Sequence, residues 1–222
     1  MGGVAPTFRA SIRPEATWIQ ASTIGHEATG ENARLAAIFG INVVDAPVLG
    51  TTGPAETGSL VTLVACKASR LDKLHHVFAS YAHEVVYAGK TPGSANALKL
   101  ACNTWIALLT AGTTQALHIT AALGLDPHPL PRRDPTHGVQ QPIRPEQGRS
   151  FCAGGEYTTQ VTVADMIKDL NLARGALPTG DTLALLTTSK PRIAGYHLRA
   201  TTWKSPPSPR HWITIKAKAL PW

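Results

Sequence analysis

The first 90 residues alternate between short apolar runs and amphipathic stretches. We predict strands in residues 15–24, 42–48, 60–65 and 84–87, and helices in residues 30–39 and 71–82. Residues 60–65 are a continuous apolar run, which is typical of a strand buried on both faces. Because strands that alternate with helices favour a layered arrangement, this pattern indicates an α/β unit with a largely parallel sheet.

The longest helical pattern covers residues 93–124. Gly124 suits the position just after a helix, and Pro127 follows it. Apolar residues recur at steps of three and four and form one stripe: Leu98, Ala101, Trp105, Leu109, Gly112, Ala116, Ile119 and Leu123. We therefore predict one long buried helix without a break between Ala97 and Ala121.

Regular patterns are sparse in the rest of the chain. Residues 157–177 have a helical pattern, whereas residues 128–155 and 187–222 hold many Pro and Arg residues and show no period. Such composition is typical of loops and of chain without a packed core. The fold class predicted from the pattern is α/β followed by α.

Charge is distributed unevenly along the chain. The net charge of +7 lies entirely in residues 127–222, because basic and acidic residues balance in residues 1–126. A basic tail with Trp203 and Trp212 among its Lys and Arg residues could combine base stacking with phosphate contacts. A non-catalytic, polyanion-binding protein is therefore an alternative, although no known nucleic-acid-binding module is present and nucleic acid is the less favoured partner.

Cysteine and hydropathy patterns exclude several other classes. Cys66, Cys102 and Cys152 lie far apart, without CxxC or Cys/His metal spacing, so we expect no metal site and a reducing, cytoplasmic setting. The apolar stretch at residues 104–124 contains Gln115 and His118, which favour a buried helix over a membrane span. No membrane partner is expected.

Lys99 and Asn103 are the candidate functional residues. Four positions apart on a helix, their side chains share one face. An ammonium and an amide side by side can bind a small polar substrate by its hydroxyl or carbonyl, and the ammonium can transfer a proton to that oxygen. The alternative is a solvated Lys and Asn on an exposed face, since most helical lysines are solvated.

Four segments occur in a characteristic order: Ala21-Ser-Thr-Ile24, residues 45–60, residues 93–103 and residues 168–173. Together they resemble the β-hydroxyacid dehydrogenase family, which includes 3-hydroxyisobutyrate dehydrogenase, tartronate semialdehyde reductase and glyoxylate/succinic semialdehyde reductase. This family is related to 6-phosphogluconate dehydrogenase.

The resemblance implies a partial Rossmann-type parallel sheet, a long interdomain helix and an incomplete all-helical domain. The corresponding boundaries are residues 1–90 for the dinucleotide-binding part, 91–186 for the helix and helical substrate and dimerisation domain, and 187–222 for an irregular basic tail. The implied activity is hydride transfer between NAD or NADP and a small hydroxy acid or semialdehyde. A non-catalytic remnant that dimerises through the helix at residues 93–124 is a further alternative.

The resemblance also assigns roles to individual residues. Lys99 would be the catalytic acid or base, and Asn103 a hydrogen-bond partner of the substrate. The backbone amides of Gly50 and Thr51 would hold the substrate carboxylate, which suits a glycine turn that lets backbone approach a ligand. On the cofactor side, Thr23 would contact the nicotinamide, and Lys168 would close over it.

The chain also departs from the family pattern. The Gly-rich GxGxxG turn that lays the pyrophosphate on a helix N-terminus is missing, so we expect the chain to begin inside the Rossmann domain. We therefore expect this truncated chain to bind the cofactor weakly or not at all and to have impaired activity. Leu49 stands where many relatives have Ser, which leaves the substrate open. The patternless segments are what an out-of-frame stretch of gene would give, with a divergent loop and tail as the alternative.

Overall fold

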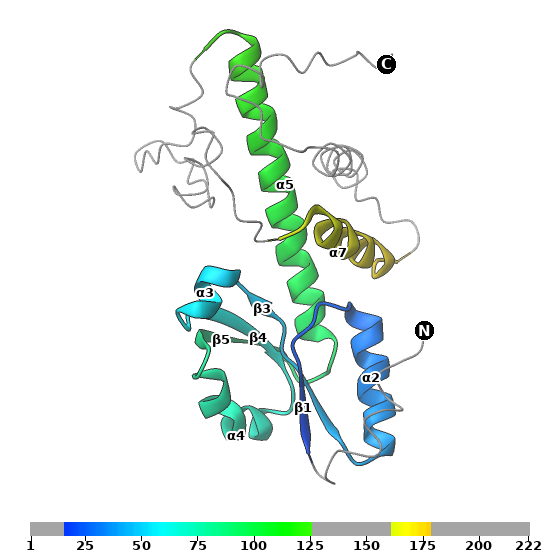
Figure 1. The fold of residues 1–222 in the computed structure, drawn as a ribbon. Coiled ribbons are helices and arrows are strands. Elements are labelled where there is room, and N and C mark those ends of the chain that lie inside the picture. The colour runs from blue at the N-terminus through cyan, green and yellow to red at the C-terminus, as the bar shows by residue number, and fades with distance from the viewer. Residues whose placement is uncertain (1–15, 126–160, 179–222) are drawn as a thin grey trace. The chain divides into compact units, whose positions relative to one another are not determined.

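A computed structural model describes residues 16–125 and 161–178 (Figure 1). The chain divides into two compact units, Met1–Trp105 with Gln160–Leu186, and Ile106–Thr159 with Thr187–Trp222. Every candidate site residue belongs to the first unit. The functional boundaries at residues 90 and 186 stay a prediction, and the patternless segments at 128–155 and 187–222 lie outside the described residues.

Five strands form one mixed sheet. They are β1 (Thr17–Gln20), β2 (Asn42–Asp45), β3 (Val48–Leu49), β4 (Leu60–Ala65) and β5 (Ala82–Gly89). The order is β1-β2-β4-β3, with β5 also paired to β4. The two longest ladders, β1 with β2 and β4 with β5, are parallel, whereas β2 and β3 pair antiparallel to β4. The predicted α/β fold with Rossmann-type parallel strands is confirmed.

The two parallel ladders meet at their carboxyl ends. A single antiparallel pairing, Asp45 with Ala65, joins the last residue of β2 to the last residue of β4. Because β1 runs parallel to β2, and β5 runs parallel to β4, the carboxyl ends of all four strands gather at this point. The last residue of β2, Asp45, also contacts the N-terminus of α5.

Four helices belong to the N-terminal part of the chain. They are α2 (His26–Ile38), α3 (Thr52–Glu56), α4 (Ala68–Phe78) and α5 (Ser94–Ala122). Helix α2 begins four residues before the predicted start, because its first turn is polar and gave no periodic signal. Helix α7 (Val163–Gly175) begins where the Thr162 side chain accepts a hydrogen bond from Asp165 N at 3.0 Å, an N-cap. Figure 1 shows α7 beside the N-terminal half of α5.

The core of the sheet is made by β2, β4 and the helices that cover them. Val44, Val64 and Phe78 are fully buried in one cluster, and Leu63, Ala65 and Ala95 form another. Strand β4 is buried along nearly its whole length, as its apolar run predicts. The second cluster fixes the start of α5 against the sheet, since Ala95 is in its first turn.

Helix α5 is continuous over 29 residues, so the prediction of one uninterrupted helix is confirmed. The predicted buried stripe is wrong, because Trp105 is 59% exposed and Leu123 is 69% exposed. Among the α5 residues whose burial is described, the buried ones are instead Ala95, Asn96, Leu100, Asn103 and Ala107. Periodicity locates an apolar face, but it does not say whether anything covers that face.

Candidate functional site

Asp45 and Asn96 are the buried polar centre of the first unit, and both are 0% exposed. Asp45 Oδ2 accepts hydrogen bonds from Gly93 N at 2.8 Å and Asn96 N at 3.0 Å, and its Oδ1 accepts one from Asn96 Nδ2 at 2.7 Å. Asp45 therefore satisfies backbone donors at the N-terminus of α5, where a negative charge is also favoured by the helix dipole. Sequence reasoning missed this pair.

Asn96 connects the same helix to the turn between β1 and α2. Its Oδ1 accepts hydrogen bonds from Ile24 N and Gly25 N, both at 3.0 Å. Gly93 has a φ of 101°, and a Cβ at this position would lie 2.7 Å from His26 O. The backbones of the turn and the helix start are thus in direct contact, which only glycine permits here. The result is a fixed position for Thr23 relative to α5.

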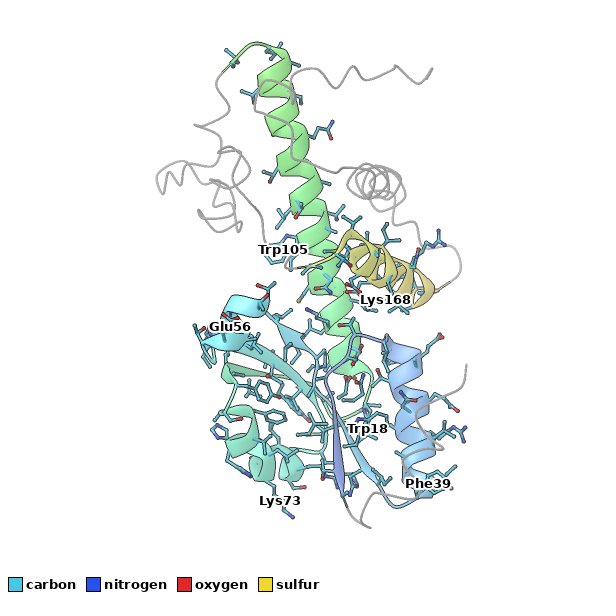
Figure 2. The ribbon with its side chains drawn as sticks, viewed as in Figure 1. Trp18, Phe39, Glu56, Lys73, Trp105 and Lys168 are labelled. Atoms are coloured by element: carbon cyan, nitrogen blue, oxygen red, sulfur yellow. The ribbon has the colours of Figure 1, made fainter. Side chains whose placement is uncertain are left out.

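Thr23 and Lys168, both predicted to be on the cofactor side, are brought together by the fold. Lys168 Nζ donates a hydrogen bond to Thr23 O at 3.2 Å. Figure 2 shows Lys168 on the side of α7 that faces the turn between β1 and α2. Lys168 Nζ also lies 3.2 Å from Asp169 Oδ1, an ion pair in which the lysine side chain is half exposed. This contact between α7 and the turn spans 145 residues of chain.

Asn103 is buried and pairs with a carboxylate of α7. Its Nδ2 donates a hydrogen bond to Asp169 Oδ2 at 2.6 Å. Asp169 is 6% exposed, and its Oδ1 makes no hydrogen bond to any residue in the ranges 16–125 and 161–178. Oδ1 lies 3.2 Å from Lys168 Nζ, and this ion pair offsets the cost of burying the carboxylate. The sequence pattern did not identify Asp169 as a site residue either.

Lys99 lies one turn before Asn103 and is half-buried rather than solvated. Burial lowers the pKa of its ammonium below the ordinary value, and the positive charge of Lys168 acts in the same direction. The negative charge of Asp169 opposes this shift and raises the pKa. A lysine with a lowered pKa gives up its proton more readily near neutral pH, as a general acid or base requires.

Gly50 and Thr51 form a second loop, between β3 and α3. Gly50 has a φ of 122°, and a Cβ there would lie 2.6 Å from Leu60 Cδ2. Thr51 has extended backbone and stands just before α3. Leu49, directly before this loop, packs against the cluster that contains Ala95 of α5. The loop is therefore linked to the start of α5, although no described hydrogen bond joins Gly50 to Lys99 or Asn103.

The turn after β1 leaves few backbone donors for a ligand. The amides of Ile24 and Gly25 are already bound to Asn96 and are not free for phosphate oxygens. Thr23 and Lys168 instead place a backbone carbonyl and an ammonium at the edge of the site. No Gly-rich phosphate-binding turn occurs among the described residues.

The described residues contain neither a metal-binding cluster nor a membrane-spanning helix. No group of three or more His, Cys, Asp and Glu side chains in residues 16–125 and 161–178 could hold a metal ion. None of the helices that the structure describes has the length and hydropathy needed to cross a lipid bilayer. The polar groups that the described residues bring together here are an amine, an amide, a carboxylate and backbone groups.

The sequence of the sheet region matches a known domain family. Residues 3–89 match the family model of the NAD binding domain of 6-phosphogluconate dehydrogenase. The chain is 27% identical over 184 residues to 2-(hydroxymethyl)glutarate dehydrogenase of Eubacterium barkeri, a match that covers 79% of this chain and 58% of the relative. It is 33% identical over 109 residues to 3-hydroxyisobutyrate dehydrogenase of Pseudomonas aeruginosa, covering 49% of this chain and 36% of the relative.

A solved structure agrees with these matches. The chain is similar to 3-hydroxyisobutyrate dehydrogenase of Mycobacterium tuberculosis with L-serine, with a TM-score of 0.70 and 25% sequence identity. The alignment covers 86% of this chain and 67% of that chain. The chain spans 58% or less of the length of the two curated relatives named above. The resemblance to the β-hydroxyacid dehydrogenase family read from the sequence is confirmed.

Proposed function

We propose that this chain transfers hydride between NAD or NADP and a small hydroxy acid or semialdehyde, with Lys99 as the proton donor and acceptor. The observation that carries the proposal is the half-buried Lys99 one helical turn from the buried amide of Asn103. Burial lowers the pKa of Lys99, which suits a group that must both give and take a proton. The matches to hydroxyacid dehydrogenases support the same reaction class.

Each predicted residue has a role in this reaction. Asn103 binds the substrate oxygen, and the backbone of Gly50 and Thr51 binds the carboxylate. Thr23 and Lys168 orient the nicotinamide ring. When bound, the cofactor accepts or supplies the hydride at the substrate carbon.

In the oxidation direction, the substrate hydroxyl proton passes to the neutral amine of Lys99 as the carbon–hydrogen bond breaks and the carbonyl forms. In the reduction direction, the Lys99 ammonium returns that proton to the oxygen. The site thus balances the loss of hydride with the transfer of one proton.

The relatives leave the substrate and the cofactor preference open. The two curated relatives described above are named for a hydroxymethylglutarate and for 3-hydroxyisobutyrate, which are both hydroxy acids. We propose the same chemical class for this chain, with either NAD or NADP. A cytoplasmic setting, a homo-oligomer through the helix at residues 93–124 and polyanion binding by the basic tail stay predictions.

The test is an assay of the purified 222-residue chain with a panel of small 3-hydroxy acids and semialdehydes, each with NAD(H) and NADP(H). Lys99→Ala should lower kcat by about 10²–10⁴-fold, the usual contribution of a general acid or base. Asn103→Ala should act mainly on KM. Lys73→Ala is the matched control, because Lys73 is exposed on α4 and lies far from α7 (Figure 2).

The outcomes separate function from folding. Near-normal turnover in Lys99→Ala would remove the proposed role of Lys99. Loss of activity in Lys73→Ala as well would show that the lysine variants unfold, which circular dichroism checks directly. A wild-type chain that neither binds NADH or NADPH in calorimetry nor turns over any substrate would overturn the proposed activity for this chain.

A further inference from the structure

Asp169 is a buried carboxylate that contacts or acts on three polar side chains of the site. Its Oδ2 accepts the 2.6 Å hydrogen bond from Asn103, and its Oδ1 lies 3.2 Å from Lys168 Nζ. It also acts electrostatically on Lys99. These contacts join α7 to α5 and to Lys168 of its own helix.

The hydrogen bond to Asp169 determines which way the Asn103 amide is turned. An ionised carboxylate can only accept hydrogen bonds, so it selects the nitrogen of the amide and rejects its oxygen. The amide oxygen and the second N–H of Asn103 are then left in one fixed arrangement for a ligand. Without the carboxylate, the amide has two orientations that differ by a half turn, and only one presents these atoms in the same places.

The charge of Asp169 also acts on the lysine that we propose as the proton carrier. The neighbouring groups that act on the pKa of Lys99 are Lys168 and Asp169 from α7 and Cys102 from its own helix. Lys168 disfavours the ammonium form of Lys99, and Asp169 favours it. Because Asp169 also forms an ion pair with Lys168, it offsets the repulsion between the two lysines.

We propose that Asp169 is a positioning residue of this site, which fixes the orientation of the Asn103 amide and balances the charges of Lys99 and Lys168. This inference deepens the proposed function and rests on it for its catalytic meaning. Asp169 does not need to touch the substrate, since it acts through Asn103 and through the field at Lys99. Because Asp169 directly follows Lys168 in the sequence, α7 positions both side chains.

The first test measures the free chain by NMR and needs no activity. In the wild type, the side-chain amide of Asn103, identified by its loss in Asn103→Ala, should give one pair of signals that exchange slowly with water. Asp169→Asn should broaden or double these signals and speed their exchange. The protonation midpoint of Lys99, followed through its side-chain carbon signals, should move downward, because the carboxylate that favours the ammonium is gone.

The control variant is Asp72→Asn, which removes an exposed carboxylate from α4 and should change neither signal. Unchanged Asn103 signals and an unchanged Lys99 midpoint in a folded Asp169→Asn chain would overturn the inference. If Asp169→Asn does not fold, Asp169→Glu decides the question. It keeps the charge but displaces the oxygen atoms, so it should disturb the Asn103 signals and leave the Lys99 midpoint close to that of the wild type.

Activity provides the second readout. Asp169→Asn should lower kcat by roughly 10²-fold or less, the range expected for a misplaced binding group, and move the pH profile in the same direction as the Lys99 midpoint. If the NMR changes occur but the wild-type chain has no turnover, the proposed function fails and the positioning role stands. If the wild type turns over substrate and Asp169→Asn changes neither readout, the positioning role alone fails.

Discussion

Asp45 and Asn96 are 51 residues apart in the chain, and a 2.7 Å hydrogen bond joins their fully buried side chains. Through this pair, the last residue of β2 holds the first turn of α5, and α5 in turn holds the turn after β1. The proposed proton carrier and the proposed cofactor contact are therefore positioned by the same two residues.

We expect Asn96→Ala to destabilise the chain by about 2–4 kcal/mol, because it leaves the amides of Ile24 and Gly25 without their acceptor and Asp45 Oδ1 without its donor. Urea unfolding measures this loss. Asn32→Ala on α2 is the matched control and should stay within about 0.5 kcal/mol of the wild type. An Asn96→Ala chain as stable as the wild type would show that water replaces these hydrogen bonds at no cost.

We expect Gly93→Ala to destabilise the chain by about 1–3 kcal/mol or more, since a side chain must adopt a left-handed backbone and its Cβ meets His26 O at 2.7 Å. Gly112→Ala makes the same chemical change inside α5, where a Cβ would have no neighbour within 4 Å. It should stabilise the helix by up to about 1 kcal/mol. Thermal unfolding of both variants should therefore shift in opposite directions, and equal shifts would contradict the contact at Gly93.

Stability should depend on pH through Lys99. Burial lowers its pKa in the folded chain below the ordinary value of 10.5, so the unfolded chain holds the proton at pH values where the folded chain has released it. Wild-type stability should then rise, relative to Lys99→Met, as pH increases from the folded pKa toward the ordinary value, and the difference should be constant below the folded pKa. Urea unfolding at a series of pH values measures this.

Lys73→Met controls for the removal of an exposed lysine from α4. If the stability difference between the wild type and Lys99→Met does not vary with pH up to the ordinary lysine value, the side chain of Lys99 is not desolvated in solution.

The two described cysteines should differ in reactivity. Cys66 is buried, and burial raises the pKa of its thiol, so little reactive thiolate is present at neutral pH. Cys102 is partly exposed. Alkylation of the native chain, followed by peptide mass spectrometry, should modify Cys102 first and Cys66 only slowly. In urea, both should react at similar rates. Rapid labelling of Cys66 in the native chain would indicate that the strand end opens readily.

The sequence predicted those parts of the fold that depend on local pattern. The apolar run at residues 60–65 became β4, and the periodic stretch from residue 93 became α5. It could not predict that Trp105 would be exposed and Asn103 buried, because burial depends on which element packs against a helix. That element is α7, about 60 residues later in the chain.

The candidate site was predictable only in part for the same reason. Lys99 and Asn103 could be paired because helical spacing relates them directly. Lys168 and Thr23 were named through family resemblance, and their 3.2 Å contact joins residues 145 positions apart. Asp45, Asn96 and Asp169 were missed because an isolated Asp or Asn gives no periodic signal. One clue was available: Asp45 ends a buried apolar strand, where an acidic residue needs partners.

The continuity of α5 limits how this protein can be altered. A helix advances about 1.5 Å and turns about 100° per residue, so Lys99 and Asn103 move as one body that is fixed at Gly93. Insertion or deletion of a single residue between Gly93 and Lys99 would turn both side chains away from α7 together. Redesign for a new substrate therefore has to leave the length of this helix unchanged and work through the separate loop at Gly50 and Thr51.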